Sequence, residues 1–254
     1  MPYLLYWCKT APTGKRLAQA LGIPHGKNLA QDTDLLIRWG CTKSVLGMVN
    51  AVLNSAAAIH RAYDKALARQ VMAWAGLPVP EVLRSGEAWQ WLHDNPGRAL
   101  VGRPAHHTSG SGFWVCRAPE EVRTAYQQGA DYFSPLLELD REYRVHVFKS
   151  RVLFVQRKKP REGVEADPIR RNHAHGWYFY RVRYYPEEIE ELAVRAVTAL
   201  GLDFGAVDVA RLTDMTFTIF EVNTAPGLTV ERNLEAWVAA FQEYITQPRE
   251  GQDV

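Results

Sequence analysis

The chain has 254 residues, of which 47% are hydrophobic and 23% are charged, and its formal net charge is +2. This length and apolar content are enough for one large core or two to three small lobes, as in an ordinary globular protein. The near-neutral charge gives no reason to expect nucleic acid or an acidic membrane as partner.

The cysteines and the amino terminus indicate the compartment. Cys8, Cys41 and Cys116 lie far apart and form no CxxC pair, which favours reduced thiols over a disulfide framework or a zinc site. The first residues lack a basic start followed by a long apolar run, and no window reaches the roughly 20 apolar residues of a membrane span. We therefore expect a cytoplasmic protein with no membrane partner.

The first part of the chain predicts a small α/β lobe, because short apolar runs alternate with helical patterns. The expected elements are a strand at residues 3–8, a helix at 13–21 that Gly22 ends, a strand at 35–39, and helical residues 44–75 with a break near 50–55.

The middle of the chain begins at the helix-closing sequence Gly76-Leu77-Pro78-Val79-Pro80. Strands and helices alternate after it, around a Gly/Ser loop. The expected elements are strands at residues 79–84, 99–103 and 113–116, and helices at 86–93 and 119–127.

Strands dominate from residue 132 onward. Tyr143 and Val145 alternate with Arg144 and His146, which predicts one arm of a β-hairpin. The other expected elements are strands at residues 152–156, 204–211 and 216–223, and helices at 186–200 and 234–245, with a loose tail at 247–254.

Positive charge is concentrated in one segment. Residues 141–183 hold twelve Lys or Arg and only four Asp or Glu. Such a segment suits a polyanionic ligand such as a triphosphate, and a solvated surface ribbon is the alternative.

Three oxygen-bearing side chains near the carboxy terminus form a candidate metal site. Glu221 and Asn223 share one face of a strand, and Asp208 can join them if its own strand pairs alongside. Magnesium prefers oxygen ligands and completes its shell with water and phosphate oxygens. Spacing alone is equally compatible with surface carboxylates on an exposed hairpin.

The two strands that carry these residues resemble the carboxy-terminal signature of the ATP-grasp superfamily. The matching sequences are Gly205-Ala206-Val207-Asp208-Val209 and Phe220-Glu221-Val222-Asn223-Thr224-Ala225-Pro226-Gly227. The resemblance implies that Asp208, Glu221 and Asn223 hold two Mg²⁺ ions that bridge the phosphates of ATP, with Mn²⁺ as an alternative ion.

Upstream motifs are similar to those of RimK-type glutamate ligases. In Ile169-Arg170-Arg171-Asn172, the resemblance places Arg170 and Asn172 beside the phosphates. In Arg141-Glu142-Tyr143-Arg144-Val145, it places Glu142 near the ribose. Residues 132–139 match the adenine hinge, with Leu136 and Leu137 as ring contacts. An ordinary core strand is the alternative for this segment.

The same resemblance covers the residues around the phosphates. Arg103 stands where the family usually has a Lys, and its planar guanidinium can also bind phosphate oxygens. Ser109 and Gly110 match the loop that folds over the phosphates. Lys65 matches a helix Lys that reaches the nucleotide, although an exposed helix Lys is the alternative. Arg157 is the expected phosphate contact in the basic run at 157–161.

Two other motifs carry little weight. The sequence around Gly14-Lys15 lacks the first glycine and the final Ser/Thr of a P-loop, so we reject a P-loop. The pairs His106-His107 and His173-x-His175 do not lie at metal-ligand spacing on an evident helix, and we do not expect zinc.

The resemblance implies an α/β ATP-grasp fold and a ligase. It predicts a pre-ATP-grasp domain at residues 1–62, a small ATP-grasp lobe at 63–131 and a carboxy-terminal lobe at 132–254. The expected activity is ATP-dependent joining of a carboxylate and an amine, both small molecules or peptides, through an acyl phosphate, with ADP and phosphate as products. The exchange at Arg103 motivates an alternative, a non-catalytic or regulatory ATP-binding protein. A nucleic-acid partner ranks last, and the sequence indicates no oligomeric state.

Overall fold

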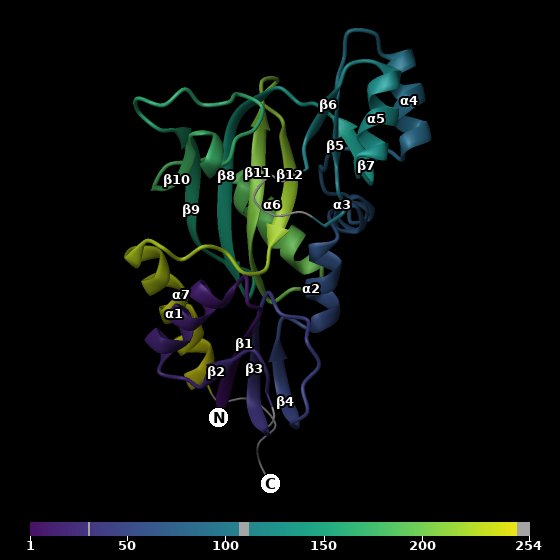
Figure 1. Cartoon of the computed structure of the whole chain (residues 1–254). Helices are drawn as coiled ribbons and strands as arrows, with labels where there is room; N and C mark the ends of the chain where they lie inside the picture. The colour runs from purple at the N-terminus through teal and green to yellow at the C-terminus, as the bar shows by residue number, and fades with distance from the viewer. Residues whose placement is uncertain (30, 107–111, 248–254) are drawn as a thin grey trace.

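The computed structural model describes residues 1–29, 31–106 and 112–247, and they form three β-sheets with helices around them (Figure 1). A five-stranded antiparallel sheet occupies the centre. A four-stranded parallel sheet that contains the amino terminus lies at one end, and a three-stranded antiparallel sheet lies beside the other end. The prediction of a mixed α/β fold is confirmed.

The amino-terminal sheet has the strand order β2-β1-β3-β4, and all its pairings are parallel. Gly22 ends the first helix in a left-handed conformation, with φ of 66°, as the sequence predicts. The elements are β1 (Pro2–Tyr6), α1 (Ala11–Leu21), β2 (His25–Gly26), β3 (Thr33–Trp39) and β4 (Val49–Leu53).

The helical pattern expected at residues 44–75, with a break near 50–55, is wrong for the residues before the break, where no helix forms. Val49–Leu53 forms an edge strand instead, because Leu35 to Ile37 of β3 offer it parallel partners and Val49 and Val52 favour extended backbone. The helical part is split into α2 (Ala56–Tyr63) and α3 (Lys65–Trp74). Asp64 lies between them, and its side chain accepts a hydrogen bond from Leu67 N to cap α3.

The small middle sheet has the order β6-β5-β7. The expected strand at residues 79–84 is reduced to one bridge, between Leu83 and Phe133, because Pro78 and Pro80 have no N–H to donate. The elements are α4 (Ser85–Asp94), β5 (Leu100–Arg103), β6 (Trp114–Cys116), α5 (Pro119–Gln127) and β7 (Tyr132–Pro135).

The central sheet has the order β10-β9-β8-β11-β12. Lys149 and Ser150 form the expected hairpin turn with φ of 45° and 61°. The edge strand β10 was not expected. The elements are β8 (Leu139–Phe148), β9 (Arg151–Pro160), η1 (His173–His175), β10 (Trp177–Val182), α6 (Glu188–Ala199), β11 (Phe204–Leu212), β12 (Phe217–Asn223) and α7 (Glu231–Thr246).

Two hydrophobic cores hold the central sheet between its neighbours. One core lies between the sheet and α6, and it includes residues of α2 and α3 such as Ile59 and Met72. The other joins the amino-terminal sheet to α7 through Trp39, Phe204 and Trp237. Both cores combine residues from the segments 1–62 and 132–254, and one also includes residues of 63–131. The division at residues 62 and 131 stays a prediction. Within the described part of the chain, no helix combines the length and apolar character of a membrane span.

Candidate active site

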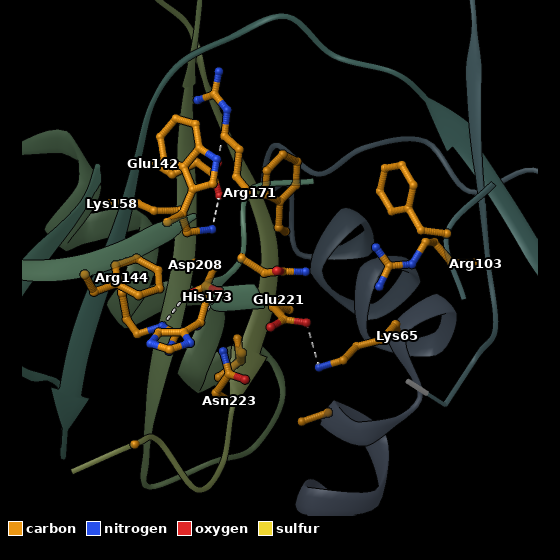
Figure 2. A pocket seen from close by; sticks show the side chains of 18 of the residues that line it. Lys65, Arg103, Glu142, Arg144, Lys158, Arg171, His173, Asp208, Glu221 and Asn223 are labelled. Atoms are coloured by element: carbon orange, nitrogen blue, oxygen red, sulfur yellow. Dashed lines mark hydrogen bonds and ion pairs between the residues drawn. The ribbon is translucent and has the colours of Figure 1, made fainter. Parts of the chain in front are cut away.

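A cleft of about 1700 Å³ lies between the central sheet, the middle sheet with α3, and the loops of the amino-terminal region, and Figure 2 shows side chains that line it. The face of the central sheet that carries Arg144 and Asp208 forms its floor, and α6 covers the opposite face. Lys65 of α3 and Arg103 of β5 line it from the side of the middle sheet. Loop residues that follow β1 and β3, such as Trp7 and Gly40, line it from the side of the amino-terminal sheet.

Cross-strand pairing brings the predicted metal ligands together. Asp208 of β11 lies directly opposite Glu221 of β12, so their side chains point to the same face of the sheet. Asn223 follows Glu221 by two residues and faces the same side, and all three line the cleft. The geometric expectation from alternation agrees with this register, whereas metal binding itself stays a prediction.

Asp208 is held by a bidentate ion pair. Arg144 Nε lies 2.6 Å from Asp208 Oδ1, and Arg144 Nη2 lies 2.7 Å from Asp208 Oδ2. Arg144 and Asp208 are register partners on β8 and β11, and the guanidinium stacks over Phe179 at 4.3 Å from the ring centre. The carboxylate therefore points into the cleft in a fixed orientation.

Glu221 is held by Lys65, whose Nζ lies 3.1 Å from Glu221 Oε2. Lys65 is 8% exposed, so the expectation of an exposed helix lysine does not describe it. Desolvation raises the pKa of Glu221, but Lys65 and Arg144 together hold that pKa well below its usual range. Glu221 therefore stays ionised, ready to bind a cation.

Glu142 lies beside two cations. It is 6% exposed, and its Oε2 is 2.5 Å from Lys158 Nζ, while its Oε1 is 3.7 Å from Arg171 Nε. Oε1 has no hydrogen-bond partner within the described residues. A carboxylate oxygen of this kind can accept a hydroxyl group of a ligand.

Arg103 and Arg170 both lie over the aromatic ring of Phe113. Their guanidinium carbons are 5.1 Å and 5.5 Å from the centre of Phe113. Burial lowers the pKa of Arg103, and its Nε has no hydrogen-bond partner among the residues described. Both arginines line the cleft, where they can meet an anion.

Some of the other predicted binding residues line the cleft, and the rest lie in a segment that the structure does not describe. Leu136, Leu137 and Asn172 line the cleft. Asn172 Oδ1 also accepts a hydrogen bond from His175 N at 3.0 Å, which holds the turn η1. Ser109 and Gly110 lie outside the described residues.

Arg157 does not line the cleft, although the sequence interpretation made it a phosphate contact. Arg157 pairs with Tyr143 and Tyr180 on the sheet face opposite the cleft, and it stacks on Tyr180. Side chains alternate along β9, so the neighbouring Lys158 points into the cleft instead.

Several cleft residues escaped the sequence analysis. Arg144 and Lys158 could have been found from the alternation of β8 and β9, which places them on the face of Glu142. Arg69 donates to Ser134 Oγ at 2.7 Å and lines the cleft. No local sequence pattern marks Arg69, because its contacts come from distant strands.

The donor set suits magnesium by its chemistry, since it offers two carboxylates and a carboxamide oxygen on one face. Within the described residues, no three His, Cys, Asp or Glu side chains form a metal-binding group. The two carboxylates instead hold Arg144 and Lys65. A metal bound here would have to share Asp208 and Glu221 with these two cations.

Known proteins similar to this chain include ligases. No protein-family model matches it. It is 29% identical to a D-alanine–D-alanine ligase of Saccharophagus degradans over 68% of this chain and 58% of that protein. It is 30% identical to a probable alpha-L-glutamate ligase of Aeromonas salmonicida over 71% of this chain and 62% of that protein. The chain thus spans less than two thirds of either relative.

Solved structures with the same fold are also ligases. The D-alanine–D-alanine ligase of Bacillus anthracis matches with a TM-score of 0.67 at 14% identity, over 94% of this chain and 91% of that one. The ATP-grasp ligase PsnB, complexed with a precursor variant, Mg and ADP, matches with a TM-score of 0.66 at 16% identity, over 94% and 98%.

The three sheets and the cleft between them define an ATP-grasp fold. The sequence of this chain is similar to two kinds of ligase, a D-alanine–D-alanine ligase and a probable alpha-L-glutamate ligase. Its similarity to a probable alpha-L-glutamate ligase agrees with the RimK-type resemblance of its motifs.

Proposed function

We propose that this chain is an ATP-dependent carboxylate–amine ligase that works through an acyl phosphate. The observation that carries the proposal is the row of paired side chains that crosses the cleft floor from Arg144 through Asp208 to Glu221 and Lys65. Similarity to two kinds of ligase supports the same reaction class.

In the proposed reaction, a substrate carboxylate oxygen attacks the γ-phosphorus of ATP, and the bond to the β,γ-bridging oxygen breaks to release ADP. An amine then attacks the acyl carbon, the bond to the phosphate oxygen breaks, and the amine loses a proton. Positioning and charge neutralisation account for such catalysis, so no covalent residue is required.

The cleft residues divide this work between them. Arg103, Arg170 and Lys158 supply positive charge at the cleft wall for the transferred phosphoryl group. Glu142 would accept a ribose hydroxyl, and Leu136 and Leu137 would cover the adenine. Asp208, Glu221 and Asn223 would hold the magnesium ions, which neutralise phosphate charge when bound. Arg157, on the other face, takes no part.

The test is to incubate the pure protein with ATP, MgCl₂ and pools of amino acids and dipeptides, and to measure ADP, phosphate and ligated product. We expect release of both ADP and phosphate with at least one pool, together with a new amide. ATP binding without turnover across all pools would instead support the non-catalytic alternative. Loss of turnover in Glu221→Gln would tie the activity to this cleft.

The small-molecule or peptide identity of the substrates and the cytoplasmic location are part of the proposal. In another structure, PsnB is complexed with the precursor peptide PsnA2, which supports a peptide as one option. Cys8, Cys41 and Cys116 are all free thiols, which supports a reducing compartment.

A further inference from the structure

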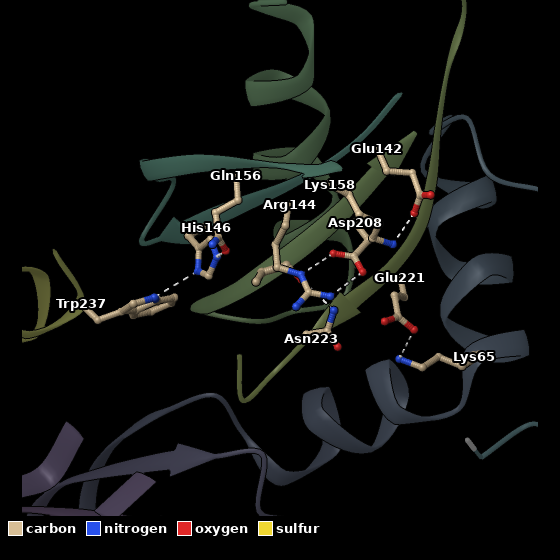
Figure 3. Close-up of polar contacts among 11 residues, drawn as sticks. Lys65, Glu142, Arg144, His146, Gln156, Lys158, Asp208, Glu221, Asn223 and Trp237 are labelled. Atoms are coloured by element: carbon tan, nitrogen blue, oxygen red, sulfur yellow. Dashed lines mark hydrogen bonds and ion pairs between the residues drawn. The ribbon is translucent and has the colours of Figure 1, made fainter. Parts of the chain in front are cut away.

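Three buried polar side chains form a hydrogen-bonded chain from helix α7 to strand β9. Trp237 Nε1 donates to His146 Nδ1 at 3.1 Å, and His146 Nε2 lies 2.8 Å from Gln156 Oε1 (Figure 3). Trp237 and His146 are fully buried, and Gln156 is 7% exposed. The residues therefore constrain one another with little competition from water.

The donors and acceptors in this chain have only one consistent order. An indole nitrogen can only donate, so Nδ1 of His146 is the acceptor and Nε2 carries the proton. That proton faces the carboxamide oxygen of Gln156, which leaves the NH₂ group of Gln156 directed away from His146. Burial lowers the pKa of His146 to about 3, so the ring stays neutral.

The NH₂ group of Gln156 is available to a ligand. Gln156 lines the cleft, and within the described residues its amide nitrogen has no hydrogen-bond partner. In the sheet register it lies between Arg144 and Arg181. Arg144 is neutralised by Asp208. Arg181, which does not line the cleft, stacks on Phe154 and donates to Arg232 O. The NH₂ group of Gln156 is therefore the donor at this end of the cleft, and it makes its strongest hydrogen bond to a negatively charged oxygen.

A second buried amide belongs to the same end. Asn233 is 3% exposed, lines the cleft and lies one helical turn before Trp237 on α7. Its Oδ1 has no hydrogen-bond partner among the residues described. Within the described part of the chain, an unpaired donor at Gln156 and an unpaired acceptor at Asn233 point to a polar ligand that offers both an acceptor and a donor, rather than to a packed core.

We propose that Gln156 is the donor of a carboxylate-binding subsite at the β9 side of the cleft, with His146 and Trp237 as its positioning residues. Gln156 lies two strands from Asp208, about 10 Å at roughly 4.8 Å per strand. The carboxylate bound here is therefore not the one that reacts beside the metal ligands. It is a second carboxylate of an amino-acid or peptide substrate, an inference that rests on the proposed ligase function.

The kinetic test uses the amino acid or peptide that supports ADP release and its analogue in which the non-reacting carboxylate is a carboxamide. In Gln156→Met we expect the KM for the acid to rise about 10- to 100-fold, because one charge-assisted hydrogen bond is lost. The KM for the carboxamide, the KM for ATP and kcat should change less than about threefold. Gln19→Glu, on the exposed side of α1, is the control. A change below twofold in the KM for the acid overturns the subsite.

Two NMR measurements separate this inference from the ligase proposal. The side-chain amide signal of Gln156, assigned by its loss in Gln156→Met, should shift when the amino-acid and dipeptide pools are added with Mg·ADP. If no pool supports turnover, the ligase proposal fails. A shift of the Gln156 signal would then still support the subsite, whereas the absence of a shift would contradict both proposals. The ¹⁵N signals of His146 should show a protonated Nε2 and an unprotonated Nδ1. A protonated Nδ1 overturns the positioning role of Trp237.

Discussion

Arg144 and Asp208 form a bidentate ion pair between β8 and β11, with distances of 2.6 Å and 2.7 Å. The pair fixes a carboxylate on the cleft floor directly opposite Glu221. The proposed function gives this carboxylate two separable contributions, one to folding through its ion pair with Arg144 and one to activity through the cleft.

Asp208→Asn should reduce both contributions. We expect the free energy of unfolding to fall by about 2 kcal/mol, because the hydrogen bonds to Arg144 lose one charged partner. Turnover should fall on the order of 100-fold through lost electrostatic stabilisation. Urea denaturation and ADP release measure the two effects. The Asp140→Asn variant, which removes an exposed pair with Arg141 and Arg211, is the control, and equal turnover in both variants would contradict the role of Asp208.

Lys65→Met should raise the pKa of Glu221, because Lys65 is the nearest of the cations that lower it. The pKa of Glu221 is lower in the folded protein than the ordinary value of 4.5. Its stabilisation is therefore present above pH 4.5 and is lost as the pH falls through the folded pKa. In Lys65→Met the folded pKa lies closer to 4.5, so the stability should fall less between pH 4.5 and pH 3, as measured by urea denaturation from pH 7 to pH 3. Unchanged curves would show that Lys65 does not control Glu221.

The alternation of side chains along single strands predicted much of the central sheet. It placed Glu221 and Asn223 on one face before any partner strand was known, and the register of Asp208 agrees with it. Alternation did not predict β10, because the residues of this strand lie within a basic and aromatic stretch that follows a loop. It also did not give the contact of Lys65 with Glu221, since two residues far apart in the chain meet only through tertiary packing.

His146 should make the protein less stable in mild acid. Burial lowers its folded pKa to about 3 from 6.5, so between these values the unfolded state binds the proton and the folded state does not. Stability therefore falls as the pH drops from 6.5 toward 3, by about 1.4 kcal/mol per pH unit for one proton. Urea denaturation of His146→Leu should show a shallower pH slope than the wild type. His93→Gln, at an exposed position, should keep the wild-type slope, and an unchanged slope in His146→Leu would contradict the assignment.

Arg103→Lys tests the residue at which the sequence departs from the family motif. Lysine keeps the positive charge but loses the planar contact with Phe113. We expect a rise in the KM for ATP of about threefold for Arg103→Lys and of about tenfold or more for Arg103→Met. Initial rates of ADP release at varied ATP measure both. A KM unchanged in Arg103→Met would remove Arg103 from the nucleotide site.

Lys158 and Arg157 are adjacent in sequence but lie on opposite faces of β9, which makes them a matched pair for the last prediction. Lys158 Nζ contacts Glu142 inside the cleft, whereas Arg157 stacks on Tyr180 behind the sheet. Lys158→Gln leaves the 6% exposed Glu142 with Arg171 as its remaining cation. We expect this variant to raise the KM for ATP about tenfold or more, since a charged hydrogen bond is lost.

Arg157→Gln should leave the KM for ATP within about twofold of the wild type, because a side chain on the far face meets no ligand and loses only a partly exposed cation–π contact. Initial-rate kinetics and thermal unfolding of both variants separate binding from stability. The opposite order, with Arg157→Gln the more damaging to the KM, would place the nucleotide on the other face of the sheet and contradict the site built from Lys65, Asp208 and Glu221.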